Sequence, residues 1–243
     1  MKNEYGLQLY SVRDAMGENM ENAIAKVAEM GYKYVEFAGF YGRSAAEVKK
    51  MLDDNGLICS GTHSDISGLL PTNIMETIEY HKTIGNSNYI MPSADVGTLE
   101  KIKRFCDIVN YAKPIMAAEG INVGFHNHSG EFQIMPWGST MHSEMEKGCG
   151  VDFEIDTFWA FNAGLDPIQV LERLKNRIHV IHVKDGFMGG KGTALGKGEA
   201  PVKAVVEYAS KNNIRMVVES ESLNPSGLEE AKVCIEYLKS LEA

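Results

Sequence analysis

The sequence predicts an α/β protein, a single-domain (β/α)8 barrel of the TIM type, and three observations lead to that fold. Short β-type runs alternate with longer helical patterns along the whole chain, which is typical of parallel strands joined by crossover helices. Eight such units fill 243 residues, a common length for one barrel domain. No dinucleotide-binding or P-loop glycine motif follows an early strand, which disfavours an open, doubly wound sheet. We therefore expect one domain over residues 1–243.

Eight short runs with the composition of β-strands are the predicted barrel strands. They cover residues 5–10, 32–37, 57–62, 88–92, 121–126, 151–156, 178–183 and 215–219. Segments with apolar residues at helical spacing lie between them, as at Met20, Ala23, Ile24, Val27 and Met30.

Glycine and proline residues mark the expected ends and starts of the helices. A glycine that tolerates the left-handed conformation is expected where a helix ends and the next strand begins. Such glycines occur at positions 31, 56, 85 and 120. Pro167 and Pro201 lie near expected helix starts, where a missing N–H costs little.

Composition restricts the partners of the protein. A net charge of −9 and a pI near 5.3 disfavour nucleic acid and anionic membrane surfaces. The four cysteines form no CxxC pair, no apolar run is long enough to span a membrane, and no apolar run follows the first lysine. We expect a cytoplasmic protein with reduced thiols and a small-molecule partner. The sequence does not decide whether the protein forms a homo-oligomer.

Polar and ionisable residues recur at the predicted strand ends, which converge at the mouth of a barrel. In order they are Gln8 and Arg13, Glu36, His63, the run HNHSGE from His126 to Glu131, Glu154 and Asp156, His182, Lys184 and Asp185, and Glu219 and Glu221. Carboxylates and imidazoles brought this close together need a compensating cation. An oxygen-rich site of this kind favours Mn²⁺, with Mg²⁺, Co²⁺ or Zn²⁺ as alternatives, as the divalent metal ion.

Strand alternation separates some of these neighbours. His182 and Lys184 share one face of their strand, whereas His179 and Asp185 point to the other. We therefore expect His179 to be structural or external. Glu154 shares a face with Asp156, and Glu219 shares one with Glu221, so alternation leaves both members of each pair open.

Several longer motifs carry a family resemblance. They are GLQLYSVRDAM, GYKYVEFAGFYG, GTH, GFHNHSGEF, FEIDTFWAFNAGLDP, RIHVIHVKDG and MVVESES. With these motifs the chain resembles the xylose isomerase-like TIM barrel family of sugar (phosphate) isomerases and epimerases nearly from end to end. The resemblance implies a (β/α)8 barrel and a metal bound by Asp156, His182, Glu219 and a fifth-strand carboxylate. We carry that last ligand over to Glu131, with His126 or His128 as the alternatives.

The resemblance also implies roles around the metal. Glu131 and Glu219 would be both ligands and proton carriers, and His63 or Lys184 would polarise substrate oxygens. The expected substrate-binding residues are Gln8, Glu36, His128 and Trp159. Tyr10, Phe37 and Tyr41 could form walls for a sugar face, although packing in the core is the commoner fate of an aromatic residue.

These roles predict a divalent-metal-dependent isomerase or epimerase of a sugar, keto-sugar or sugar phosphate, acting by proton transfer through a metal-stabilised enediolate. A metal-dependent dehydratase or lyase acting on a keto-sugar, keto-glycoside or inosose is the alternative. A non-catalytic sugar-binding barrel is less favoured than either of these enzymes. An endonuclease IV-type phosphodiesterase is disfavoured by the negative charge and by seven histidines scattered along the sequence.

A glycine-rich segment over residues 185–200 follows the seventh predicted strand. It could cradle a phosphate or close as a lid, but it has no fixed phosphate motif and we expect a mobile loop. A phosphorylated substrate is therefore not required.

Overall fold

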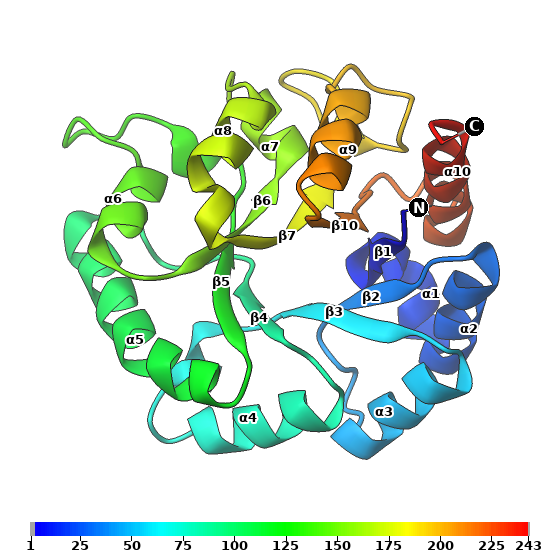
Figure 1. Cartoon of the computed structure of the whole chain (residues 1–243), viewed down its shortest axis with the longest axis horizontal. Coiled ribbons are helices and arrows are strands. Elements are labelled where there is room, and N and C mark those ends of the chain that lie inside the picture. Colours follow the sequence, from blue (N-terminus) through cyan, green and yellow to red (C-terminus); the bar gives the residue numbers. More distant parts are fainter. Residues whose placement is uncertain (1–2, 243) are drawn as a thin grey trace.

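Eight parallel strands close into a barrel in the computed structural model, which describes residues 3–242 (Figure 1). The barrel strands are β1 (Tyr5–Gln8), β2 (Tyr34–Ala38), β3 (Ile58–His63), β4 (Asn88–Met91), β5 (Asn122–His126), β6 (Asp152–Asp156), β7 (Ile178–Val183) and β10 (Arg215–Val218). Each of them overlaps one of the eight predicted runs, and β2 and β3 extend one residue beyond theirs. The fold class predicted from the alternation is thus confirmed.

Ten helices surround the barrel among the described residues (Figure 1). They are α1 (Arg13–Glu18), α2 (Met20–Met30), α3 (Ala45–Asp54), α4 (Ile74–Thr83), α5 (Leu99–Ala118), α6 (Met141–Gly148), α7 (Thr157–Asn162), α8 (Pro167–Leu174), α9 (Val202–Lys211) and α10 (Gly227–Ser240). Helix α3 begins with a capping box between Ser44 and Glu47, and α2 ends at Gly31 with a φ of 96°. The glycine signal explains why the end of α2 could be predicted from the sequence.

Closure of the barrel joins the two ends of the chain. Strand β1 pairs with β10, and the backbone N–H of Asn3 and the hydroxyl of Tyr5 both donate to Oε1 of Glu242, at 3.1 and 2.7 Å. Figure 1 shows the first strand beside the last helix, α10. Among the described residues no helix has both the length and the apolar character needed to cross a membrane.

The interior of the barrel has an apolar layer and a polar layer. Ile90, Val180 and Val217 form a small buried cluster of their own, separate from the large core between strands and helices. Two residues further along β7, and therefore closer to the mouth, the inward-facing side chain is His182. The polar layer above the apolar one is where the candidate site lies.

Candidate metal centre at the barrel mouth

A pocket of about 380 Å³ opens at the carboxyl ends of the strands. It is lined by Tyr10, Ala38, His63, Pro92, His126, His128, Glu219 and Glu221. This is the face at which barrel enzymes of this type bind their substrates. Of the predicted catalytic and substrate-binding residues, the lining includes His63, His128 and Glu219.

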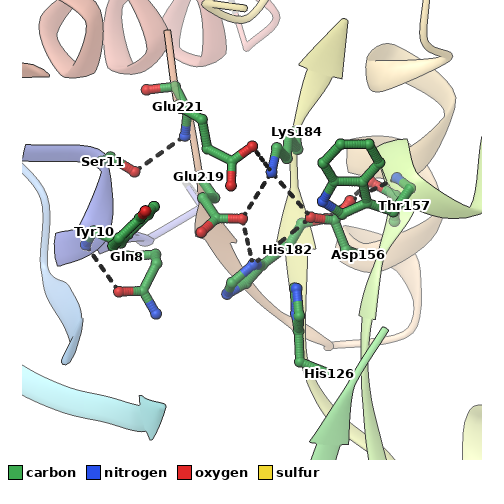
Figure 2. Close-up of polar contacts among 12 residues, drawn as sticks. Gln8, Tyr10, Ser11, His126, Asp156, Thr157, His182, Lys184, Glu219 and Glu221 are labelled. Atoms are coloured by element: carbon green, nitrogen blue, oxygen red, sulfur yellow. Dashed lines mark hydrogen bonds and ion pairs between the residues drawn. The ribbon is translucent and has the colours of Figure 1, made fainter. Parts of the chain in front are cut away.

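Four side chains near this pocket form a group that we call the mouth group. It consists of His126, Asp156, His182 and Glu219, each with one ligand atom within 4.8 Å of the others. All four are buried. Nδ1 of His182 lies 3.3 Å from Oε2 of Glu219 and 3.9 Å from Oδ2 of Asp156 (Figure 2). The register of β6 against β7 places Asp156 beside His182, which brings the predicted pair together.

A second group lies deeper in the barrel, and we call it the deep group. It consists of His63, His126, Glu154 and His182, and it shares two histidines with the mouth group. Nε2 of His63 lies 2.7 Å from Oε2 of Glu154, and Nε2 of His182 lies 3.3 Å from the same oxygen. Glu36 on β2 adjoins this group, with Oε1 3.0 Å from Nε2 of both His63 and His182.

Several of these buried ligand atoms have no hydrogen-bond partner among the described residues. In the mouth group they are Oδ2 of Asp156, Nδ1 of His126 and Nδ1 of His182. A buried polar atom without a partner costs about 1–3 kcal/mol, so three of them side by side are expensive. Carboxylate oxygens and imidazole nitrogens are also the ligands that Mn²⁺, Zn²⁺ and related ions take. The mouth group therefore fits a divalent cation.

The backbone around Asp156 determines which of its oxygens is free. Oδ1 accepts a hydrogen bond from the backbone N–H of Trp159 at 2.8 Å and so caps helix α7. Asn127 accepts a hydrogen bond from the backbone N–H of Asp156 and donates one to its carbonyl oxygen. With the residue fixed from both sides, Oδ2 alone is left to face His182.

The pKa values of the buried carboxyl groups are shifted in opposite directions. Burial raises the pKa of Asp156 to about 6, helped by nearby Glu219, and burial together with Glu36 raises the pKa of Glu154 well above its ordinary value. Burial also opposes ionisation of Glu219, but Lys184 and His182 hold the pKa of its carboxyl well below the usual range. Of the two carboxyl groups of the mouth group, Glu219 is thus the one kept ionised at neutral pH.

The pKa values of the buried histidines are also shifted in opposite directions. Burial lowers the pKa of His63 and, with repulsion from His182 and His63, lowers the pKa of His126 well below its ordinary value. Burial also disfavours the charged form of His182, but Glu154, Glu36 and Glu219 raise the pKa of that imidazole well above its usual value. In the absence of a cation, protonated His182 therefore supplies positive charge to both groups, and a bound cation would replace that proton.

Lys184 connects the mouth group to the rim. Its Nζ lies 3.0 Å from Oε2 of Glu219, 2.9 Å from Oε2 of Glu221 and 3.7 Å from Oδ2 of Asp156 (Figure 2). The ammonium also lies 4.7 Å from the centre of the Trp159 ring. Although burial opposes its charge, the three carboxylates raise the pKa of Lys184 above its ordinary value.

Comparison with known proteins agrees with this geometry. The family described as xylose isomerase-like TIM barrel matches residues 24–241. The chain belongs to the xylose isomerase-like TIM barrel family. A comparison with curated protein sequences gives no significant match.

Three solved structures show how the family fold recurs. A sugar phosphate isomerase/epimerase from Parabacteroides distasonis is 25% identical, with a TM-score of 0.83 over 99% of this chain and 94% of the other. An L-ribulose 3-epimerase is 13% identical, with a TM-score of 0.73 over 100% and 96%. A probable 3-DHS dehydratase from Bacillus anthracis is 12% identical, with a TM-score of 0.72 over 98% and 99%. The last two share only the fold with this chain.

Glu131 is the predicted ligand that the fold does not bring to either group of this xylose isomerase-like barrel. It lies in the loop after β5, where its Oε2 accepts a hydrogen bond from the backbone N–H of His128 at 2.9 Å. His126, the last residue of β5, takes its place in the mouth group. The reason is that β5 ends at His126 and its side chain points inward, whereas Glu131 is five residues further into the loop.

Other predicted positions also differ from their expected surroundings. Gln8 and Glu36 are fully buried beneath the histidines and do not line the pocket. Phe37 is packed in the core, so it is not a wall for a sugar. Glu154 received no role from the sequence, although its shared face with Asp156 indicated that it points inward. His179 is external as predicted, with 45% of its side chain exposed.

The histidines of the mouth group and the deep group are scattered in sequence but not in space. The ring centres of His63, His126 and His182 lie 4.7–5.3 Å from one another. The scattering of the histidines along the sequence was therefore no valid argument against a histidine-rich centre. Parallel strands bring residues about 60 positions apart to the same height in the barrel, which sequence distance does not reveal.

The glycine-rich segment over residues 185–200 is anchored rather than loose. It contains a short hairpin, β8 (Asp185–Gly186) with β9 (Gly192–Thr193). The buried carboxylate of Asp185 accepts hydrogen bonds from the backbone N–H groups of residues 186, 196, 198 and 200, at 2.8–3.1 Å. A Cβ at Gly198 would lie 2.3 Å from Oδ1 of Asp185. These amides are already satisfied, so they are not free to cradle a phosphate.

Proposed function

We propose that this protein is a sugar isomerase or epimerase that uses a divalent cation, Mn²⁺ in preference to Mg²⁺, Co²⁺ or Zn²⁺. The observation that carries the proposal is the mouth group, in which His126, Asp156, His182 and Glu219 turn unpartnered or ionised atoms toward one another beside a sugar-sized pocket. Membership of the xylose isomerase-like family and the name of the Parabacteroides distasonis structure support the same activity class.

When bound, the cation supplies electrostatic stabilisation for the negative charge that develops on the sugar oxygens. The chain supplies the proton transfer. Glu219 lines the pocket and is held ionised by Lys184, so it accepts the proton from the carbon next to the sugar carbonyl. If Glu219 returns the proton to the neighbouring carbon, the product is the isomer. If another group returns it on the opposite face, the product is the epimer.

His63 is the group best placed to act with Glu219. It lines the pocket, and its Nε2 is bonded to the buried Glu154 at 2.7 Å. Burial lowers the pKa of His63, so the ring is neutral at pH 7 and can accept a proton, which it can then pass on. His128 also lines the pocket, and Trp159 lies beside His128 and beside the buried Lys184.

The direct test compares metal content in three matched variants. Protein is stripped with chelator, reloaded with Mn²⁺, and its metal measured by mass spectrometry. Asp156→Asn and Glu219→Gln should lose most of the bound metal, and Glu131→Gln, which makes the same chemical change outside the mouth group, should keep it. Stoichiometric metal in the first two variants would show that the site is assigned wrongly.

Catalysis is tested separately by deuterium exchange. Metal-loaded protein is incubated in D₂O with a panel of ketohexoses and ketopentoses, and the sugars are followed by NMR. Deuterium at a carbon next to the carbonyl is expected, with an isomer or epimer as product. A dehydrated product would favour the lyase alternative, and bound sugar without any exchange would favour a binding protein.

A phosphodiesterase that acts on DNA is not supported at this pocket. Glu219 and Glu221 line it, and the nearby Lys184 is already within 3.7 Å of three carboxylates. A phosphate backbone approaching this rim would meet negative charge. Metal-loaded protein should therefore leave an abasic DNA duplex uncleaved.

A further inference from the structure

The ring of His182 faces two kinds of surroundings. On one side Nδ1 lies 3.3 Å from Oε2 of Glu219 and 3.9 Å from Oδ2 of Asp156, and it has no hydrogen-bond partner among residues 3–242. On the other side Nε2 is hydrogen-bonded to Oε1 of Glu36 at 3.0 Å. The free nitrogen thus faces the mouth group, and the bonded nitrogen faces the interior of the barrel.

A neutral imidazole that binds a metal through one nitrogen carries its proton on the other. That N–H usually donates to a carboxylate or carbonyl, which fixes the tautomer and the ring orientation and makes the ligating nitrogen more basic. Oε1 of Glu36 occupies the position that such an acceptor would take. We propose that Glu36 is a positioning residue, which holds His182 as its Nε2–H tautomer so that Nδ1 binds a cation in the mouth group.

Glu36 is itself fixed from two directions. The side-chain N–H of Gln8 donates to Oε1 of Glu36, and Oε1 of Gln8 accepts a hydrogen bond from the backbone N–H of Tyr10 at 3.0 Å. On the other side, the neighbouring β3 carries Gly61, where a Cβ would lie 2.9 Å from Oε2 of Glu36. The fold therefore leaves room for this carboxylate and holds it in one place.

The same geometry keeps Glu36 and Gln8 away from the pocket. Both side chains are fully buried, and neither lines the pocket. It also chooses between the two groups, because a cation in the deep group would need the lone pair of His182 on Nε2. That nitrogen already bonds Glu36. Nδ1 has no such partner, so the cation belongs to the mouth group.

This inference rests on the cation of the proposed function, and NMR can test the two apart. Protein labelled with nitrogen-15 in histidine is loaded with cadmium-113, and the His182 signals are assigned from a His182→Asn variant. We expect coupling between cadmium and Nδ1, with the ring proton on Nε2. Coupling to Nε2 would overturn the role of Glu36 while keeping a metal site. Absence of any bound cadmium or Mn²⁺ would overturn both proposals.

A matched pair of variants tests the positioning role itself. Glu36→Gln should weaken Mn²⁺ binding about 10–100-fold, as loss of an outer partner of a metal-bound histidine does. Glu154→Gln makes the same change to a buried carboxyl group that is hydrogen-bonded to His63 and lies 3.3 Å from Nε2 of His182 without a hydrogen bond to it, and it should weaken binding much less. Equal losses in both variants would show a general charge effect and sink the inference. If Glu36→Gln does not fold, the NMR spectrum of the cadmium-loaded unmodified protein still shows which nitrogen of His182 binds the metal.

Discussion

The ammonium of Lys184 lies 3.0 Å from Oε2 of Glu219, so a buried cation of the chain itself stands beside the carboxylate proposed to carry the proton. The same ammonium lies 2.9 Å from Glu221 at the rim. A lysine in this place keeps Glu219 ionised, and it competes with any metal for the same negative charge.

Replacing Lys184 by Met should separate these two effects. The substitution keeps most of the length of the side chain and removes its charge. Turnover should fall about 100-fold because the proton-accepting carboxylate loses its partner. Binding of Mn²⁺ should be kept or become tighter, because one competing charge is gone. Deuterium exchange and calorimetric titration measure the two. Lys203→Met on the surface of α9 is the control, and unchanged turnover in Lys184→Met would contradict the assigned role.

Metal binding should also stabilise the fold. At a free Mn²⁺ concentration of about 100 times the dissociation constant, a ligand bound only by the folded state adds about 2.7 kcal/mol. For a chain of this size that corresponds to a rise in Tm of roughly 5–10 °C. Calorimetry with and without chelator measures it. Asp156→Asn should abolish the shift and Glu131→Gln should keep it, and a shift that survives in Asp156→Asn would place the cation elsewhere.

His142 should make the protein sensitive to acid. Its ring is 1% exposed and stacks between Phe132 and Phe153, with ring centres 4.7 and 4.3 Å away. Burial, with Arg173 and Arg177 nearby, lowers the pKa of His142 to about 3. As the pH falls below about 6.5 the unfolded chain takes up a proton on this residue and the folded protein does not, so stability is lost by about 1.4 kcal/mol per pH unit until about pH 3.

The variant His142→Phe removes this proton uptake. Between pH 7.5 and pH 5.0 its free energy of unfolding should fall by about 2 kcal/mol less than that of the unmodified protein. Any change in packing affects both pH values equally and cancels in this difference. Urea unfolding at the two pH values measures the difference. The exposed His179→Gln is the control and should not reduce the acid loss. An identical pH dependence in His142→Phe would show that this ring is not kept neutral by the fold.

Asp185 should determine the order of the glycine-rich loop. In Asp185→Asn an NH₂ group replaces one carboxylate oxygen and faces backbone N–H donors. At least one of the four hydrogen bonds is therefore replaced by repulsion. We expect a loss of about 1–3 kcal/mol in stability and faster proteolysis within residues 187–199. Glu199→Gln changes a carboxylate in the same loop whose single bond, from the N–H of Met188, an amide oxygen can still accept. Equal cleavage of both variants would refute the anchoring role.

The alternation of strand and helix patterns was enough to predict the barrel. Glycines at helix ends, such as Gly31 with its φ of 96°, gave the boundaries, because their conformation is a local property of the backbone. Alternation along β7 also separated the inward His182 and Lys184 from the external His179. In each case the interaction that decides the structure lies within a few residues of the chain.

The sequence by itself thus determined the fold, the family motifs and three members of the mouth group: Asp156, His182 and Glu219. Only the tertiary structure decided the fourth, since the inward direction of His126 and the displacement of Glu131 depend on where β5 ends in the closed barrel. It also decided that Gln8 and Glu36 are fully buried and do not line the pocket. The physical reason is that burial and the partners of a side chain are set by strands brought together from distant parts of the chain, and no local pattern encodes their distances.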